Sequence, residues 1–351
     1  MMKTIDLRSD TITLPDEEMI ESIKISKLGD DVYGEDSLVN QLEEKAAKMM
    51  GKEAGLLLTS GTQGNLVGIL SQTNHGDEII LEKDAHIFYY EVAGISAFGG
   101  LMPRTIAGKN GIMSPEDIKN NIRVKDIHQP VTSLVSVEQT HNRGGGIVIP
   151  TNVIDEIGLL AKENNMAFHM DGARVFNAAT YLKTDVSRIV KNTSTVQFCL
   201  SKGLSAPIGS LLVGPASTIE KARKFRKMLG GGMRQAGVIA GPGIIALEKM
   251  TKRLQVDHDN ATLLSKGLKN IPNASWTIVE PQTNIVKVTL ADENAREIYD
   301  ILKQIHIKIS VMDSHTIRFT THRMINSSDI EEFLTRIENY KPLIALISNN
   351  N

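Results

Sequence analysis

The chain has 351 residues, 41% of them hydrophobic and 23% charged, which is typical of a globular protein and not of a disordered one. A formal net charge of −2 offers no strong field to a nucleic-acid backbone or an anionic membrane, so we expect a small-molecule substrate and neither of those partners. The single cysteine, Cys199, excludes an intramolecular disulfide, and the sequence shows no long uncharged apolar run and no secretion signal. We therefore expect a cytoplasmic protein.

Two helices are predicted near the start of the chain. Apolar positions recur at helical spacing over residues 15–27 and again over Ser37–Met50, where Gly51 follows as a natural end. The intervening residues 29–36 are turn-rich and acidic and carry Tyr33. We expect that loop to be exposed or to lie at an interface.

Short apolar or β-branched runs then alternate with helical segments such as residues 152–165. This alternation predicts an α/β fold with a mostly parallel sheet and helices on both faces. The predicted strands are residues 54–59, 78–81, 133–137, 167–170, 195–200 and 210–213. Polar residues follow several strand ends, the edge at which open α/β sheets bind ligands. They are His86, Glu138, Asp171 with Arg174, and Ser201 with Lys202.

The pattern changes in the last third of the chain. After the glycines at 230–232 we expect a long helix that ends near Asn260. Shorter alternating stretches follow at residues 283–290, 307–311 and 316–319, and they predict a smaller C-terminal α+β domain.

Three features, in sequence order, match the needs of a pyridoxal-phosphate (PLP) site. Ser60-Gly61-Thr62 opens a helix, Asp171 ends one apolar run, and Lys202 follows another. PLP requires a phosphate cradle, an acid that keeps the pyridine nitrogen protonated, and a lysine for the Schiff base. A helix N-terminus favours phosphate, Gly61 permits close backbone approach, and Thr62 adds a hydroxyl donor. Each feature alone also fits a plain N-cap or a surface lysine, but together they predict a PLP site.

Several motifs lie between about residue 4 and residue 323. They are Asp6-Leu7-Arg8-Ser9-Asp10-Thr11, Gly29-Asp30-Asp31-Val32-Tyr33-Gly34, Ser60-Gly61-Thr62-Gln63, Glu138-Gln139-Thr140-His141-Asn142, Asp171-Gly172-Ala173-Arg174, Leu200-Ser201-Lys202-Gly203 and Gly230-Gly231-Gly232-Met233-Arg234-Gln235. Together they resemble the threonine aldolase family. The resemblance implies a PLP-dependent transferase-like fold of type I, in the aspartate aminotransferase superfamily, with a mostly parallel seven-stranded sheet in its large domain.

The resemblance also implies a domain division and an assembly. Residues 1–50 would form an N-terminal segment that contributes to the active site and an interface, residues 51–245 the large PLP-binding domain, and residues 246–351 the small C-terminal domain. The assembly would be a homotetramer, a dimer of dimers with shared active sites.

Carried over position by position, the resemblance assigns four residues to the cofactor ring. Lys202 would form the Schiff base, and Asp171 would bond the pyridine nitrogen. Arg174 would reach the ring hydroxyl and help bind substrate, while His86 would stack on the ring. Alternatively, His86 could be a core histidine that hydrogen-bonds to the backbone.

A second set would bind substrate or arrive from another subunit. Arg318 would clamp the substrate carboxylate with help from Ser9, although an arginine in an alternating strand could simply be solvated. Tyr33 would reach the substrate, and Lys227 and Arg234 the cofactor, from a neighbouring subunit. No His-x-x-x-His or cysteine cluster indicates a catalytic metal, and a structural cation near residues 11 and 13 is implied by resemblance only.

The implied reaction is aldol cleavage of L-threonine, L-allo-threonine or related β-hydroxy-α-amino acids to glycine and an aldehyde. His86 and His128 rank first as the base that removes the β-hydroxyl proton, with Glu91 or a bound water as alternatives. His128 lies in a polar loop, where an idle histidine is common.

Rival functions stay open. β-Elimination, transamination and racemisation use the same cofactor and scaffold. A PLP-binding protein without catalysis is a further alternative. A dinucleotide-binding domain is disfavoured, because no G-x-G-x-x-G follows a predicted strand. The sequence leaves the preference between threonine and allo-threonine open.

Overall fold

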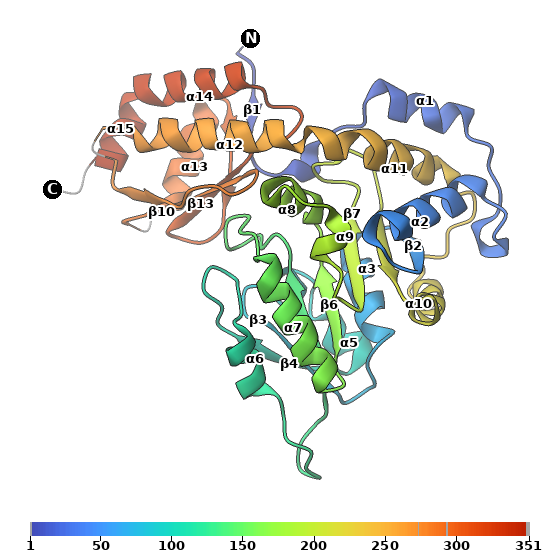
Figure 1. Cartoon of the computed structure of the whole chain (residues 1–351). Coiled ribbons are helices and arrows are strands. Elements are labelled where there is room, and N and C mark those ends of the chain that lie inside the picture. The colour runs from blue at the N-terminus through green and yellow to red at the C-terminus, as the bar shows by residue number, and fades with distance from the viewer. Residues whose placement is uncertain (1, 273, 293, 349–351) are drawn as a thin grey trace.

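A seven-stranded sheet in the order β2-β8-β7-β6-β5-β3-β4 forms the centre of the larger part of the molecule (Figure 1). The computed structural model describes residues 2–272, 274–292 and 294–348. The strands are β2 (Ala54–Leu58), β3 (Glu78–Glu82), β4 (Met102–Ile106), β5 (Thr132–Glu138), β6 (Ala167–Asp171), β7 (Thr195–Cys199) and β8 (Ser210–Gly214). Strand β8 runs antiparallel to both of its neighbours, and all other neighbouring pairs are parallel. The predicted mostly parallel seven-stranded sheet is confirmed.

Helices cover both faces of this sheet, because alternate side chains of each strand point to opposite sides. Leu57 and Phe198 belong to the core on one face, and Leu56 and Leu212 to the core on the other. The first face is covered by α2 (Ser37–Met50), α6 (Pro115–Asn121), α7 (Thr151–Glu163), α8 (Val175–Leu182), α9 (Val186–Ile189) and α11 (Gly237–Lys249). The second is covered by α3 (Gly61–Leu70), α5 (Gly94–Gly99) and α10 (Ala216–Met228).

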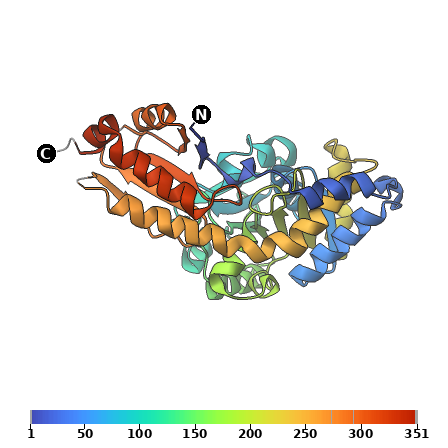
Figure 2. The same cartoon turned by 90° about the horizontal axis from the view of Figure 1, so that it is seen from above.

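A smaller α+β unit stands beside the large sheet (Figures 1 and 2). Its antiparallel sheet has the order β12-β13-β10-β9. Its elements are α12 (Leu254–Lys269), β9 (Trp276–Ile278), β10 (Ile285–Leu290), α13 (Ala295–Gln304), β12 (Ser310–Val311), β13 (Thr316–Thr320), α14 (Ser327–Asn339) and α15 (Lys341–Ser348).

The beginning of the chain packs into this C-terminal unit. Strand β1 (Ile5–Asp6) pairs in parallel with β11 (Ile307–Lys308), and the side chains of Ile5 and Leu7 are buried in the core of the small unit. The chain then passes between the two units through the short helix η1 (Asp10–Ile12) before α1 (Glu17–Ile25) and the turn η2 (Asp31–Tyr33). The N-terminal segment is therefore placed at the boundary where the strand ends of the large sheet meet the small unit.

Two expectations about the C-terminal third are wrong. The expected single helix is two helices, α11 and α12, joined by η3 (Met250–Arg253), and α12 continues past Asn260 to Lys269. Asn260 does not end the helix but is buried within α12. Its side chain donates a hydrogen bond of 3.0 Å to the carbonyl of Ile325, a tertiary partner that no local sequence pattern reveals. The stretch 307–311 is likewise divided between β11 and β12, which belong to different sheets.

No helix in the described part of the chain has the length and hydropathy needed to cross a bilayer.

Candidate active site

A cavity of about 300 Å³ lies between the carboxyl ends of the central strands and the small unit. It is lined by Ser9, Thr11, His86, Tyr90, Asn142, Arg174, Lys202, Ser310, Val311, Met312 and Arg318. Four other surface hollows, of about 310, 390, 670 and 720 Å³, are larger but are lined by none of the predicted site residues. The smaller cavity is the candidate site, since it gathers predicted residues from the N-terminal segment, the large sheet and the small unit.

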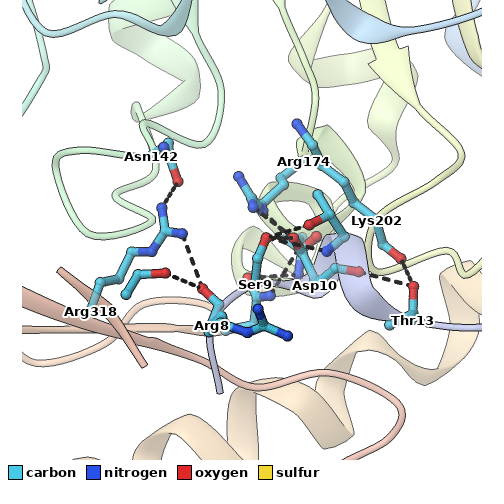
Figure 3. A network of polar contacts seen from close by, with 12 residues as sticks. Arg8, Ser9, Asp10, Thr13, Asn142, Arg174, Lys202 and Arg318 are labelled. Carbon is cyan, nitrogen blue, oxygen red and sulfur yellow. Dashed lines mark hydrogen bonds and ion pairs between the residues drawn. The ribbon is translucent and has the colours of Figure 1, made fainter. Parts of the chain in front are cut away.

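The side chain of Lys202 lines this cavity. Its backbone carbonyl accepts a hydrogen bond of 2.8 Å from the Thr13 hydroxyl, which fixes the turn after β7 (Figure 3). Within the described ranges, Lys202 Nζ makes no hydrogen bond or ion pair. The buried Asp10 carboxylate is close enough to interact with this amine electrostatically, but it does not bond to it. A primary amine that faces a cavity without such a bond is available for covalent chemistry.

Asp171 ends strand β6 as a buried carboxylate. Its Oδ2 accepts a hydrogen bond of 3.0 Å from Asn65 Nδ2, and its Oδ1 accepts one of 3.0 Å from the Ala173 N–H. Asn65 Nδ2 also donates to Glu91 Oε1 at 2.8 Å, and Asn65 Oδ1 pairs with His169 Nε2 at 3.1 Å. Burial lowers the pKa of His169 to about 4, so this ring is neutral and donates to Asn65. The network fixes which side of Asn65 faces the two carboxylates.

His86 lies over this network at the start of α4 (His86–Tyr89). Its Nδ1 pairs with Glu91 Oε1 at 2.8 Å, and one ligand atom each of His86, Glu91 and Asp171 lie within 4.8 Å of one another. Burial by itself lowers the pKa of His86, but the hydrogen bond to Glu91 and the charge of Asp171 outweigh it, so that this pKa is raised. Burial and the charge of Asp171 also raise the pKa of Glu91. Nδ1 is thus engaged, and Nε2 is the ring nitrogen left for a ligand.

Arg174 is held by Asp10 from the N-terminal segment. Its Nε and Nη2 donate to the two carboxylate oxygens of Asp10 at 2.7 Å each, and Asn284 donates to the same carboxylate at 3.2 Å (Figure 3). Although burial opposes it, the Arg174 charge holds the pKa of Asp10 well below its usual range. Two of the three guanidinium nitrogens, Nε and Nη2, therefore bond to Asp10, and Nη1 is the nitrogen left to contact a ligand in the cavity.

Arg318 presents a second buried guanidinium to the same cavity. Its Nη1 donates to Asn142 Oδ1 at 2.7 Å and its Nη2 to the carbonyl of Arg8 at 3.1 Å, while its buried Nε has no partner (Figure 3). Burial, together with the charge of Arg174, lowers the pKa of Arg318 to about 10. No carboxylate pairs with Arg318 within the described residues. A cation held only by neutral groups, with one donor unused, fits a ligand carboxylate.

The N-terminus of α3 fits a phosphate. The first N–H groups of a helix have no partner within the helix, and the Ser60 side chain accepts only the Gln63 N–H, at 3.2 Å. A Cβ at Gly61 would lie 2.9 Å from Cys199 Sγ and 3.2 Å from Gln197 Nε2, so glycine allows α3 to begin this close to β7. The N–H groups of Gly61 and Thr62 therefore remain for an anion.

Seven predicted residues do not line this cavity, and Asp171, Gly61 and Thr62 are three of them. The other four are exposed. Tyr33 is 75% exposed, Lys227 is exposed, and Arg234 pairs with Asp30 at 3.0 Å at the surface. Their action from a neighbouring subunit stays a prediction. His128 is exposed in the loop that precedes β5, at the opposite edge of the sheet from the cavity, and its role also stays a prediction.

Sequence reasoning gave no role to Asn65, Asn142 or Asp10. Asn65 carried one readable signal, since it is an amide followed directly by the apolar run that completes α3, where a buried polar group needs partners. Ser9 lines the cavity as predicted, but the hydrogen bonds of Arg318 go to Asn142 and Arg8 and not to Ser9.

Comparison with known proteins adds independent information. The family model described as beta-eliminating lyase matches residues 6–291. The chain is 39% identical over 329 residues to the low specificity L-threonine aldolase of Escherichia coli K12, with 93% of this chain and 96% of that protein covered. The structure is similar to that of Leishmania major threonine aldolase, with a TM-score of 0.82, 18% identity, and 97% of this chain and 100% of that chain covered.

A serine palmitoyltransferase solved with PLP has a TM-score of 0.77 at 18% identity, with 98% of this chain and 89% of that chain covered. At such identities the structural likeness establishes the fold alone. The predicted PLP fold of type I is confirmed.

Proposed function

Because the chain belongs to the threonine aldolase family of beta-eliminating lyases, we propose that it cleaves the Cα–Cβ bond of L-threonine, L-allo-threonine and related β-hydroxy-α-amino acids. The products are glycine and an aldehyde, which is acetaldehyde for the first two substrates. One observation carries the proposal: the unpartnered amine of Lys202 and the incompletely bonded guanidinium of Arg318 face one cavity. An amine for the cofactor and a clamp for an amino-acid carboxylate are the two groups that such a reaction needs.

The residues present fit PLP as the cofactor. Lys202 would hold it covalently as a Schiff base, Asp171 would bond the pyridine nitrogen, and Arg174 Nη1 would reach the ring hydroxyl. The phosphate would bind at the N–H groups of Gly61 and Thr62. When bound, PLP supplies an electron sink that accepts the electron pair of the broken Cα–Cβ bond.

The chain's own residues orient the substrate and move one proton. Arg318 would bind the substrate carboxylate through the N–H groups of Nη1 and Nη2 that Asn142 and Arg8 leave free, and would thereby set which bond at Cα is aligned for cleavage. Two N–H donors, from Asn65 and Ala173, hold the Asp171 carboxylate in place, and it would bond the protonated pyridine nitrogen. His86 Nε2 would accept the β-hydroxyl proton while Glu91 holds Nδ1. His128 would take part only if another subunit brings its loop to the cavity.

The proposal extends to the assembly and its setting. A cytoplasmic homotetramer with shared sites would bring Tyr33, Lys227 and Arg234 to a neighbouring cavity. Lys227 lies in the last turn of α10 and Arg234 in the loop that follows. This loop passes beside the N-terminus of α3, since a Cβ at Gly231 would lie 2.2 Å from Gln63 Nε2. Basic side chains beside a helix N-terminus support an anion site near a subunit boundary.

β-Elimination is the second candidate, favoured by the description of the matching family model. It would yield a keto acid and ammonia in place of glycine and an aldehyde. Analysis of the products from L-threonine separates the two reactions.

The test is an absorbance spectrum of PLP-supplemented protein, followed by addition of L-threonine or L-allo-threonine with acetaldehyde measured by a coupled reductase. We expect a visible band, lost in Lys202→Ala and kept in Lys221→Ala, an exposed lysine of α10. Acetaldehyde and glycine should form in equal amounts. An intact band in Lys202→Ala would refute the central assignment, and a band without glycine formation would refute aldol cleavage.

A further inference from the structure

Glu138 holds two segments of the candidate site with one carboxylate. It is the last residue of β5 and is 4% exposed. Its Oε2 accepts a hydrogen bond of 2.8 Å from the backbone N–H of His86, and its Oε1 accepts one of 3.0 Å from the backbone N–H of Asn142. The two N–H groups belong to different loops, one after β3 and the other after β5, and neither bond is part of a strand or helix ladder.

Each of these loops carries one functional group of the cavity. The first leads into α4 and presents the imidazole of His86. The N-cap residue of α4 is Ala85, whose side chain cannot accept a hydrogen bond from the first N–H groups of the helix. The second presents the Asn142 amide, whose Oδ1 accepts the hydrogen bond of 2.7 Å from Arg318 Nη1. The Glu138 carboxylate therefore connects the imidazole to the guanidinium through two charge-assisted hydrogen bonds, which are stronger than neutral ones.

We propose that Glu138 is a positioning residue that fixes the imidazole of His86 relative to the carboxylate clamp of Arg318. The inference rests on the proposed function, because it assumes that one group accepts the hydroxyl proton while the other binds the carboxylate of the same substrate. A substrate bound at two points reacts efficiently only when both points keep their separation, since a displacement of about 1 Å can cost two orders of magnitude in rate. The role differs from catalysis, because Glu138 does not line the cavity.

Glu82 provides a matched control. It ends the adjacent strand β3, is 2% exposed, and also accepts two backbone N–H groups, from Asp84 at 2.6 Å and Gly108 at 3.0 Å. Neither of those residues lines the cavity. A glutamine at either position keeps one oxygen acceptor but turns an amide donor toward the second N–H. Glu82→Gln also weakens the contact of Glu82 Oε2 with His141 Nε2 at 3.1 Å, so it removes at least as many contacts as Glu138→Gln and is a stringent control.

The experiment compares Glu138→Gln, Glu82→Gln and Asn142→Ala with wild type in the full PLP-loaded chain. If Glu138→Gln breaks the bond to the Asn142 N–H, we expect the KM for L-threonine and the Kd for glycine, read from the cofactor band, to rise about tenfold. If it breaks the bond to the His86 N–H, we expect kcat to fall about tenfold. Asn142→Ala, which breaks only the arginine arm, should raise KM and the glycine Kd with little change in kcat. Glu82→Gln should keep KM, kcat and the glycine Kd within about threefold of wild type, while its Tm falls about as much as that of Glu138→Gln.

Crystal structures of the cofactor-free Glu138→Gln and Glu82→Gln proteins give a readout that is independent of activity. In the first, the His86 ring or the Arg318 guanidinium should move by about 1 Å, and in the second neither should move. Equal effects of the two substitutions, or no displacement in Glu138→Gln, would overturn the inference. If wild type forms the visible band but no glycine, the proposed function fails, while the two structures still decide the role of Glu138.

Discussion

Arg174 and Asp10 form a bidentate ion pair inside the molecule, with both nitrogen–oxygen distances at 2.7 Å and both side chains at 5% exposure or less. Asp10 belongs to a short segment that touches the candidate site at three points. The Arg8 carbonyl bonds to Arg318, the Asp10 carboxylate to Arg174, and the Thr13 hydroxyl to the carbonyl of Lys202. The N-terminal segment is thus part of the wall that orients the cavity's cations (Figure 3).

Asp10→Asn should destabilise the protein strongly. Removal of one partner from a buried ion pair leaves an uncompensated charge and costs about 3–5 kcal/mol in the free energy of unfolding, which urea titration measures at neutral pH. Asp6→Asn, which breaks a more exposed pair with Arg8, is the control and should cost less than about 1 kcal/mol. A similar small loss for both would show that the buried pair has no special weight.

The same pair predicts an acid limb in the stability. Since the folded pKa of Asp10 lies below its ordinary value, the unfolded chain binds the proton more readily. The contribution is therefore present at neutral pH and is lost as the pH falls below about 4.

Arg318→Lys should weaken substrate binding and leave the visible band intact. A lysine keeps the positive charge but cannot offer the planar fork of donors to a carboxylate, and we expect the KM for L-threonine to rise about 10- to 100-fold. Arg323→Lys is the control, because Arg323 bonds to the Leu14 carbonyl and the Ser205 hydroxyl and does not line the cavity. An unchanged KM would remove Arg318 from the substrate site.

Glu91→Gln should shift the acid limb of the pH–rate profile to lower pH. His86 must be neutral to accept a proton, and its pKa is raised by its hydrogen bond to Glu91 and by the charge of Asp171. The loss of one carboxylate lowers the pKa of His86, so kcat should begin to rise at a lower pH than in wild type. The measurement is kcat for L-threonine between about pH 5 and pH 9. A limb that stays in place would mean that another group accepts the proton.

His258→Gln should make the stability less dependent on acid. Burial lowers the pKa of His258 to about 4 from an ordinary value of 6.5, and its Nε2 pairs with the Asn177 amide at 3.1 Å. Between those two pH values the unfolded chain holds a proton that the folded chain lacks, so stability falls as the pH falls.

This one proton contributes about 1.4 kcal/mol per pH unit to the pH dependence of the free energy of unfolding. Urea unfolding at pH 6.5, 5.5 and 4.5 should show a slope smaller by up to that amount in His258→Gln. The exposed His75, replaced by glutamine in the same way, is the control. Identical slopes in all three proteins would contradict the prediction.

Local elements could be predicted from the sequence because their signals are local. Helix α2 has the predicted bounds, since Asp36 accepts the N–H groups of Leu38 and Val39 at one end and Gly51 takes the left-handed conformation at the other. Strand β4 was missed because it lies at the sheet edge, where half-buried residues and Pro103 give no apolar run. The split of residues 307–311 between two sheets was missed because both strands are only two residues long.

The sequence by itself determined the family, the alternation that gives a mostly parallel sheet, and the positions of Lys202, Asp171 and Gly61 after or before strands and helices. Those features follow from side-chain period and turn chemistry, which act over a few residues. Only the tertiary structure decided that Asp10 holds Arg174 and that one glutamate, Glu138, holds the loops of His86 and Asn142. From the sequence alone, a carboxylate could equally well be hydrated at the surface or bonded inside the protein. Its partner is chosen only when folding removes that water and brings together backbone and side-chain donors that lie far apart along the chain.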